Sequence, residues 1–166
     1  MKALIQRVSE ASVIINGSRV AEIGSGILLF VGIEKADSLR DIEHLVTKVE
    51  RLRIFEDDHG KMNRSVKDIA GSVLVVSQFT LTSDCRKGSR PSFDTAEEPG
   101  RARELYDAFV RMMGKSGLQV TTGQFGAYMK VDLVNDGPVT FLIDSRRARS
   151  TGTGQRLPEE TTATHP

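Results

Sequence analysis

The chain has 166 residues, an ordinary length for one globular domain. Lys and Arg number 23 and Asp and Glu 22, so no overall positive field draws the chain to nucleic acid, and such a partner would need a local basic patch. The single cysteine, Cys85, cannot form an internal disulfide, and the longest apolar run, residues 27–33, is too short to span a bilayer. Residues 1–7 lack the apolar stretch of a signal peptide, so we expect a cytoplasmic protein with no membrane partner.

The first part of the chain predicts several strands and one helix. Residues 2–8, 12–15 and 19–23 are typical of short strands, with a hairpin turn at Asn16 and Gly17. The apolar run at residues 27–33 favours a strand that is buried on both faces. Residues 37–55 carry apolar side chains at three- and four-residue spacing, which predicts an amphipathic helix.

The ends of this first helix carry their own signals. Ser38 and Asp41 have the spacing of a capping box at the helix start. His44 lies off the apolar stripe and is expected on the surface. The acidic residues beside His59 in residues 56–60 could suggest a metal site, but no second cluster of ligands exists. A solvated turn is therefore the favoured interpretation of residues 56–60.

The second part of the chain predicts a buried strand, a loop, a helix and further strands. Residues 72–81 favour a central strand that starts apolar and turns polar at its end. The polar end is either a row of polar side chains at the rim of the sheet or a functional site. Thr95 and Glu98 predict a capping box before a helix that ends near Met113. Strands are expected at residues 118–122, 127–134 and 139–144. The composition then changes, which predicts a domain over residues 1–145 and a polar, disordered tail over residues 146–166.

Most familiar catalytic chemistries are excluded by what the chain lacks. A Ser or Cys nucleophile needs a histidine base close by, and the three histidines fall in an expected surface helix, a turn and the tail. Walker and dinucleotide motifs are absent, and too few His and Cys residues exist for a zinc site. We therefore expect no metal and no cofactor, and an enzyme here would rely on main-chain groups acting on a reactive ester.

Residues 135–140 contain the least ordinary turn in the sequence. Asp136 and Gly137 between apolar segments favour a hairpin corner, because glycine enters positive φ without a steric clash. Pro138 does not suit a central strand, since it lacks an N–H group. Two interpretations stay open at this point: a trans-proline at a hairpin corner, or a shaped loop that presents its carbonyls to a ligand.

Two segments together resemble the signature motifs of the D-aminoacyl-tRNA deacylases: Ser-Gln-Phe-Thr-Leu at residues 77–81 and Asn-Asp-Gly-Pro-Val-Thr at residues 135–140. Residues 1–8, 87–93 and 125–129 are also similar to that family. The resemblance covers residues 1–149 and implies an α+β fold with a β-barrel-like mixed sheet and two main helices in a single domain. It implies a homodimer that hydrolyses the ester between a D-amino acid and the 3′-terminal adenosine of tRNA.

The resemblance also implies roles for particular residues. Gly137 and Pro138 would form a Gly-cisPro motif that reaches across the dimer, excludes an L side chain and accepts D-amino acids and glycine. Proton handling would fall to the 2′-hydroxyl of the tRNA, although another view of the family makes Thr80 the nucleophile. The expected catalytic segment is Gln78, Phe79 and Thr80, the expected pocket residues are Ser77, Phe125, Ala127, Met129 and Asn135, and the candidate contacts to the tRNA acceptor end are Arg86, Lys87 and Arg90.

Two alternatives to an esterase belong to other classes. One is a nucleic-acid-binding module without catalysis that uses the loop around residues 86–90 and the basic start of the tail. The other is a barrel that binds a small metabolite and has no dependence on tRNA. The paired motifs favour the esterase over both.

Overall fold

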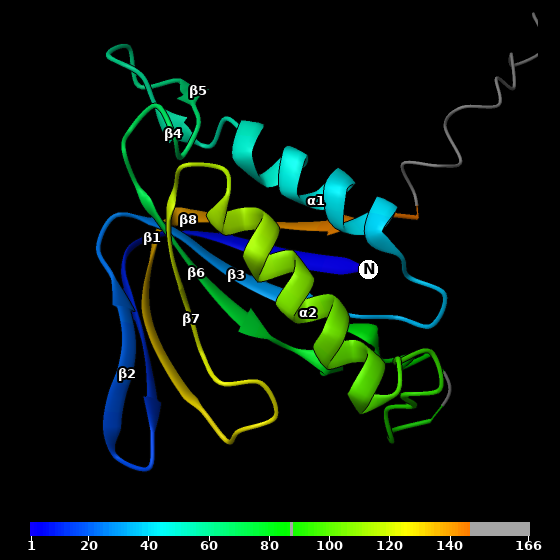
Figure 1. Ribbon diagram of the computed structural model, residues 1–166. Helices are drawn as coiled ribbons and strands as arrows, with labels where there is room; N and C mark the ends of the chain where they lie inside the picture. The colour runs from blue at the N-terminus through cyan, green and yellow to red at the C-terminus, as the bar shows by residue number, and fades with distance from the viewer. Residues whose placement is uncertain (87, 147–166) are drawn as a thin grey trace, which may run out of the picture.

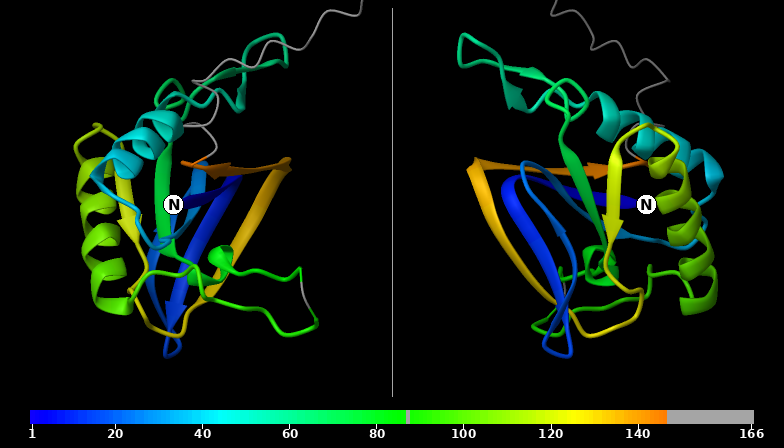
Figure 2. Two further views of the ribbon diagram at one scale, coloured as in Figure 1. Left: turned by 90° about the vertical axis from the view of Figure 1, so that its right-hand side faces the viewer. Right: turned by 60° about the vertical axis from the view of Figure 1, so that its left-hand side comes forward.

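The computed structural model describes residues 1–86 and 88–146, which form a curled mixed sheet with two helices on its outer face (Figure 1). Figure 2 shows the curl from the side: the sheet bends into a nearly closed barrel and both helices lie outside it. The fold class expected from the sequence, an α+β barrel-like domain with two main helices, is confirmed.

The sheet has the order β2-β1-β3-β6-β7, and β8 pairs with the other edge of β1. Pairing is antiparallel around β1 and parallel from β3 to β6 and from β6 to β7. The bounds are Lys2–Ile15 for β1, Ser18–Ile23 for β2, Gly26–Gly32 for β3, Ser72–Ser77 for β6, Gln119–Thr122 for β7 and Lys130–Asp144 for β8.

β1 is one long strand, so the prediction of two short strands over residues 2–15 is wrong. Its first half pairs with β3 and its second half with β2, while β8 follows it along nearly its whole length. Register shifts near Val8 let the strand bend where it changes partners. This bend closes the sheet on itself.

The central strands are buried on both faces, as their continuous apolar runs predict. Ile27, Leu29 and Val31 pack beneath the helices, whereas Leu28 faces the interior of the barrel together with Leu74. The alternation follows from the two-residue period of a strand, which sends neighbouring side chains to opposite faces. Two apolar clusters on either side of β3 and β6 therefore make these strands the rigid centre of the fold.

The helices α1 (Leu39–Arg51) and α2 (Pro99–Gly114) begin differently. The Asp41 carboxylate accepts from the Ser38 N–H and hydroxyl groups, both at 2.9 Å, so the first predicted capping box is confirmed. The second is wrong, because α2 has Glu98 at its N-cap without a side-chain cap. The Thr95 hydroxyl donates instead to the Thr82 carbonyl. Among the described residues, no helix is long and apolar enough to cross a membrane.

α1 ends four residues before the predicted boundary because the chain becomes extended at Leu52 and enters a small hairpin. Its strands are β4 (Phe55–Glu56) and β5 (Met62–Arg64), and they enclose the predicted polar turn. Asp57 accepts from the His59 and Lys61 N–H groups, and these bonds hold its pKa below the ordinary value. His44 is exposed on α1, as predicted.

Candidate active site

A cavity of about 560 Å³ lies at the carboxyl ends of β3 and β6 and reaches the first turn of α2. Val31 and Val76 contribute its strand walls, and Pro99 and Ala102 contribute the helix wall. The structure brings together the predicted residues Ser77, Gln78, Phe79, Phe125, Ala127 and Met129 in its lining. The sequence interpretation did not name Glu97 and Tyr128 as site residues, although both line the cavity and Tyr128 lies in the family-like segment at residues 125–129.

The segment after β6 leaves strand geometry at the border of this cavity, so the prediction of a strand to residue 81 is wrong. The Gln78 N–H still donates to the Val31 carbonyl at 2.8 Å, and the chain then turns into the short 3-10 helix η1 (Phe79–Thr82). The opening turn of such a helix leaves N–H groups without helical acceptors. Within the described residues, the Phe79 and Thr80 N–H groups have no protein acceptor.

The side chains of the motif do not form a nucleophile and base pair. Thr80 is exposed, does not line the cavity and accepts a 2.5 Å hydrogen bond from the Gln78 side-chain amide. An amide nitrogen cannot remove the hydroxyl proton. His44 lies on α1 and His59 in the β4–β5 turn, and the third histidine falls outside the described residues.

The aromatic wall of the cavity is anchored to the core. The rings of Phe125 and Tyr106 have centroids 5.6 Å apart, and the Arg103 guanidinium lies 5.8 Å from the Phe125 centroid. The Tyr106 hydroxyl donates to the Val75 carbonyl at 3.0 Å, and burial raises the pKa of this phenol. Phe125 is therefore held by a packed neighbour that is itself bonded to β6.

The loop after η1 carries the candidate tRNA contacts, but its arginines differ. Arg86 forms a two-pronged pair with the Asp84 carboxylate, which lowers the pKa of Asp84 to about 2. Arg90 is exposed and forms no ion pair among the described residues. Lys87 lies outside the described residues. Cys85 is exposed, as predicted.

The segment around Gly137 and Pro138 is a bulged loop inside β8, not the hairpin corner that the local sequence favours. Gln6 pairs with Thr140 and Val8 with Asn135, so residues 136–139 leave the ladder opposite a single β1 residue. A proline fits there because the bulge needs no ladder hydrogen bond. Gly137 has a φ of 121° and the Gly137–Pro138 peptide bond is cis.

Arg7, whose role was not foreseen, supports this loop. Its guanidinium donates to the Asp136 carbonyl at 3.1 Å and to the Ile54 carbonyl at 2.7 Å, although the residue is only 6% exposed. Asn135 closes the base of the loop: its amide, suitably oriented, reaches the Arg7 and Val139 carbonyls. Asn135 therefore does not line the cavity of its own chain. The strand also carries Lys2, Gln6 and Glu10, so no local pattern marked Arg7.

The loop and the cavity of one chain lie apart. Arg7 pairs with Ile27 near the start of β3, whereas the cavity lies beside Val31 at the end of that strand. Four residues of strand correspond to roughly 13 Å. Figure 2 shows the same separation between the bend of β8 and η1. Gly137 and Pro138 are thus not part of the cavity within a single chain.

These observations define a small barrel-like domain whose cavity is bordered by free main-chain donors. The family described as D-Tyr-tRNA(Tyr) deacylase matches residues 4–144. The chain belongs to this family and is a hydrolase that acts on ester bonds.

Similar proteins cover nearly the whole described chain. A D-aminoacyl-tRNA deacylase of Geobacter sulfurreducens is 56% identical over 153 residues, which are 92% of this chain and 100% of the relative. One of Thermotoga petrophila is 56% identical over 147 residues, 89% of this chain and 99% of the relative.

Two solved structures are also similar. The c-Myc DNA Unwinding Element Binding Protein has a TM-score of 0.82 at 41% identity, covering 87% of this chain and 98% of its own. A probable eukaryotic D-amino acid tRNA deacylase has a TM-score of 0.73 at 16% identity, covering 86% of this chain and 97% of its own, which supports the fold alone.

Proposed function

We propose that the chain hydrolyses the ester between a D-amino acid, or glycine, and the 3′-terminal adenosine of tRNA. The observation that carries this proposal is the cavity beside the free N–H groups of Phe79 and Thr80, within a family of deacylases. The relatives at 56% identity carry the name D-aminoacyl-tRNA deacylase, which supports the same substrate class here.

The chemistry needs few side chains, because an aminoacyl ester is already reactive. Water attacks the ester carbonyl, and the carbonyl oxygen becomes an oxyanion that the Phe79 and Thr80 N–H groups stabilise. The bond to the ribose oxygen then breaks, and the ribose hydroxyl and a free amino acid leave. We assign the proton transfers to the neighbouring 2′-hydroxyl of the substrate, since the exposed Thr80 hydroxyl contacts only an amide and lacks a base.

The selection for D-amino acids comes, in this proposal, from Gly137 and Pro138 of a second copy of the chain. Three features of β8 support a dimer. Its bulged loop lies away from its own cavity, its outer edge pairs with no strand among the described residues, and it exposes Val134, Phe141 and Leu142. An unpaired edge with exposed apolar side chains is typical of an interface.

In the dimer, the carbonyls of Gly137 and Pro138 would face the substrate's α-carbon and leave no space for an L side chain. Rejection by a clash sets no demand on the D side chain, so many D-amino acids and achiral glycine fit the same site. Asn135, predicted in the substrate pocket, would act by holding the base of this loop.

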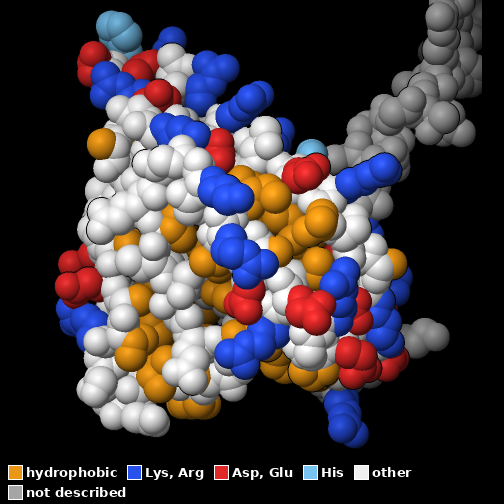
Figure 3. Space-filling model, viewed as in Figure 1, with side chains coloured by type: hydrophobic (Ala, Val, Ile, Leu, Met, Phe, Trp, Pro, Cys, Tyr) orange, Lys and Arg blue, Asp and Glu red, His pale blue; other side chains and the backbone are white. Residues whose placement is uncertain are grey.

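The grip on tRNA is expected to be small. Lys, Arg, Asp and Glu side chains are interspersed on the face that bears the helices (Figure 3), and Arg86 is already paired with Asp84. Arg90 remains the best described candidate for a phosphate contact, with Lys87 as a further candidate. Few neutralised phosphates predict a shallow dependence of binding on salt concentration.

The direct test compares D-Tyr-tRNA with L-Tyr-tRNA as substrates of the purified protein. We expect rapid release of D-tyrosine and an L-Tyr-tRNA that decays no faster than in buffer. Equal hydrolysis of the two substrates would contradict the proposed selection for D-amino acids. If neither substrate is hydrolysed, the proposed esterase activity is contradicted.

A second candidate is nucleic-acid binding without catalysis. The similar protein at 41% identity is named as a DNA unwinding element binding protein, which favours this candidate. Deleting residues 147–166 keeps the described domain intact and removes most of the predicted basic tail. Tight binding of tRNA without turnover, lost on this deletion, would favour the binding module over the esterase.

A further inference from the structure

The carbonyl groups of η1 are all engaged, and one of them is held from a distant part of the chain. The Leu81 carbonyl accepts from the Lys2 ammonium at 3.1 Å, across 79 residues of sequence. The Phe79 carbonyl accepts from the Thr82 hydroxyl, and the Thr80 carbonyl accepts from the Ser83 N–H. The Thr82 carbonyl accepts from the Thr95 hydroxyl. The turn that presents the free N–H groups is thus fastened on its carbonyl side.

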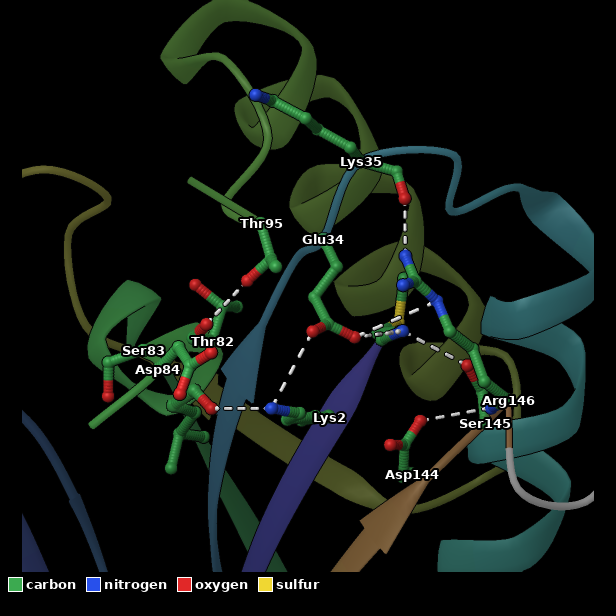
Figure 4. Close-up of polar contacts among 12 residues, drawn as sticks. Lys2, Glu34, Lys35, Thr82, Ser83, Asp84, Thr95, Asp144, Ser145 and Arg146 are labelled. Carbon is green, nitrogen blue, oxygen red and sulfur yellow. Dashed lines mark hydrogen bonds and ion pairs between the residues drawn. The ribbon is translucent and has the colours of Figure 1, made fainter. Parts of the chain in front are cut away.

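Lys2 is itself held in place by a buried carboxylate. Its ammonium lies 3.6 Å from Oε1 of Glu34, whose side chain is only 6% exposed (Figure 4). The second carboxylate oxygen, Oε2, makes no hydrogen bond in the described chain and lies 3.5 Å from the Met1 ammonium and 3.8 Å from Arg146. A buried carboxylate that contacts three cations fixes the position of each.

The surrounding cluster gives this carboxylate a rigid base. The Met1 ammonium donates to Asp37 at 2.6 Å and to the Ser145 hydroxyl at 3.0 Å, and Arg146 donates to the Lys35 carbonyl. Arg146, predicted as the first residue of the tail, is therefore bonded to the domain. The cluster joins the start of β1, the end of β8 and the loop before α1.

We propose that Lys2 is a positioning residue for the reaction, acting through η1. The ammonium aligns the Leu81 peptide and with it the Phe79 and Thr80 N–H groups, which lie within the two preceding residues of the same turn. Oxyanion stabilisation depends on donors that are already in place before the reaction, so a loosened turn lowers the rate of the chemical step. This inference rests on the proposed function for its kinetic part and on the contacts of η1 for its structural part.

The kinetic test uses Lys2→Met, which keeps the length of the side chain and removes the donor. We expect kcat on D-Tyr-tRNA to fall about tenfold with KM changed less than about twofold, because the lost alignment matters in the transition state. Lys2→Arg restores a donor and should recover most of the rate. The matched control is Lys35→Met, whose exposed side chain points away from the cluster (Figure 4) and should leave kcat unchanged.

A second readout is independent of catalysis. Amide hydrogen exchange over residues 78–84 should accelerate in Lys2→Met and not in Lys35→Met. Unchanged exchange and an unchanged kcat in Lys2→Met would overturn the proposal, as would equal losses in the two variants. If the wild-type protein hydrolyses no D-aminoacyl-tRNA, the proposed function fails, and the exchange data still decide whether Lys2 holds η1.

Discussion

Thr80 stands in the signature segment, and its surroundings decide between two mechanisms. Its hydroxyl is exposed and accepts a hydrogen bond from the Gln78 amide at 2.5 Å. A nucleophilic hydroxyl needs a base to take its proton, and neither described histidine lies in the η1 segment or in the cavity lining. The main-chain N–H of Thr80 can serve the reaction without the side chain.

We therefore expect Thr80→Ala to retain hydrolysis of D-Tyr-tRNA within about tenfold of the wild-type kcat, because the main-chain donor remains. Steady-state kinetics with equal amounts of folded protein would measure this. A loss on the order of 10⁴-fold, as found when a nucleophile is removed, would return Thr80 to the centre of the mechanism.

Asp84 and Arg86 give a pH prediction at the same scale. The hydrogen bonds from Arg86 lower the pKa of Asp84 from its ordinary 3.8 to about 2. Because the folded-state pKa is depressed, any stabilisation by this exposed pair is complete above pH about 4 and is lost as the pH falls toward 2. Arg86→Met should raise the Asp84 pKa toward 3.8 in a carboxyl NMR titration, with part of the lowering kept by the main-chain N–H of residue 86, and an Asp84 pKa that stays near 2 would contradict the side-chain pairing.

At the scale of elements, the position of η1 depends on close packing against β3. A Cβ atom added to Gly32 would lie 3.0 Å from the Gln78 carbonyl oxygen and 3.0 Å from the Leu81 Cβ. Both neighbours belong to the chain around η1 and cannot rotate away. Glycine at position 32 therefore allows the turn to approach the strand.

Gly32→Ala should push η1 outward, lower the free energy of unfolding by about 1–3 kcal/mol and reduce kcat. Gly100→Ala, whose Cβ would meet nothing within 4 Å on α2, is the matched control; it should leave kcat unchanged and should not lower the free energy of unfolding, because alanine favours a helix over glycine. Chemical denaturation and steady-state kinetics provide the two measurements. Wild-type stability and rate in Gly32→Ala would show that the turn tolerates displacement.

The elements that could be predicted were those in which the apolar pattern of the sequence corresponds to the faces that are buried in the fold. Residues 27–33 and 73–76 are apolar almost throughout and lie between two apolar clusters, so their period and their environment agree. η1 could not be foreseen, since Ser77 to Leu81 alternates like a strand and the turn depends on packing against Gly32. The single long β1 depends on β8, which is distant in sequence and follows both of its halves.

The site was predictable to a similar extent. The motif segments placed six predicted residues in one cavity, but no local pattern encodes the contacts of Lys2 and Arg7 or the place of Glu97 in the cavity lining. The local sequence at Gly137 favoured a hairpin corner because Asp-Gly normally ends a strand, whereas β8 takes up its pairing with β1 again at Thr140, as in the alternative of a shaped loop.

At the scale of the whole molecule, the cavity and the Gly137 loop are separated within one chain, so the proposed selection for D-amino acids needs a second copy. In the proposed function, the chiral filter of one protomer comes from its partner. Gly137→Ala should displace the loop, because a Cβ there would lie 2.9 Å from the Arg7 guanidinium and 2.7 Å from the Val139 side chain. The resulting defect should be a loss of D-Tyr-tRNA hydrolysis, a gain of L-Tyr-tRNA hydrolysis, or both.

The most direct measurement mixes two variant proteins, Gly137→Ala and Ala127→Phe. The Ala127→Phe protein has its own cavity filled by the phenylalanine side chain but keeps an intact Gly137 loop. After subunit exchange at equal amounts, about half of the open cavities should face an intact loop, and a tenfold excess of Ala127→Phe should repair about nine-tenths of them. The double variant Ala127→Phe with Gly137→Ala is the control and should repair none. We predict that the preference for D-Tyr-tRNA over L-Tyr-tRNA, per open cavity, rises as Ala127→Phe is added. A preference that stays the same whatever the partner would contradict a filter shared between two copies.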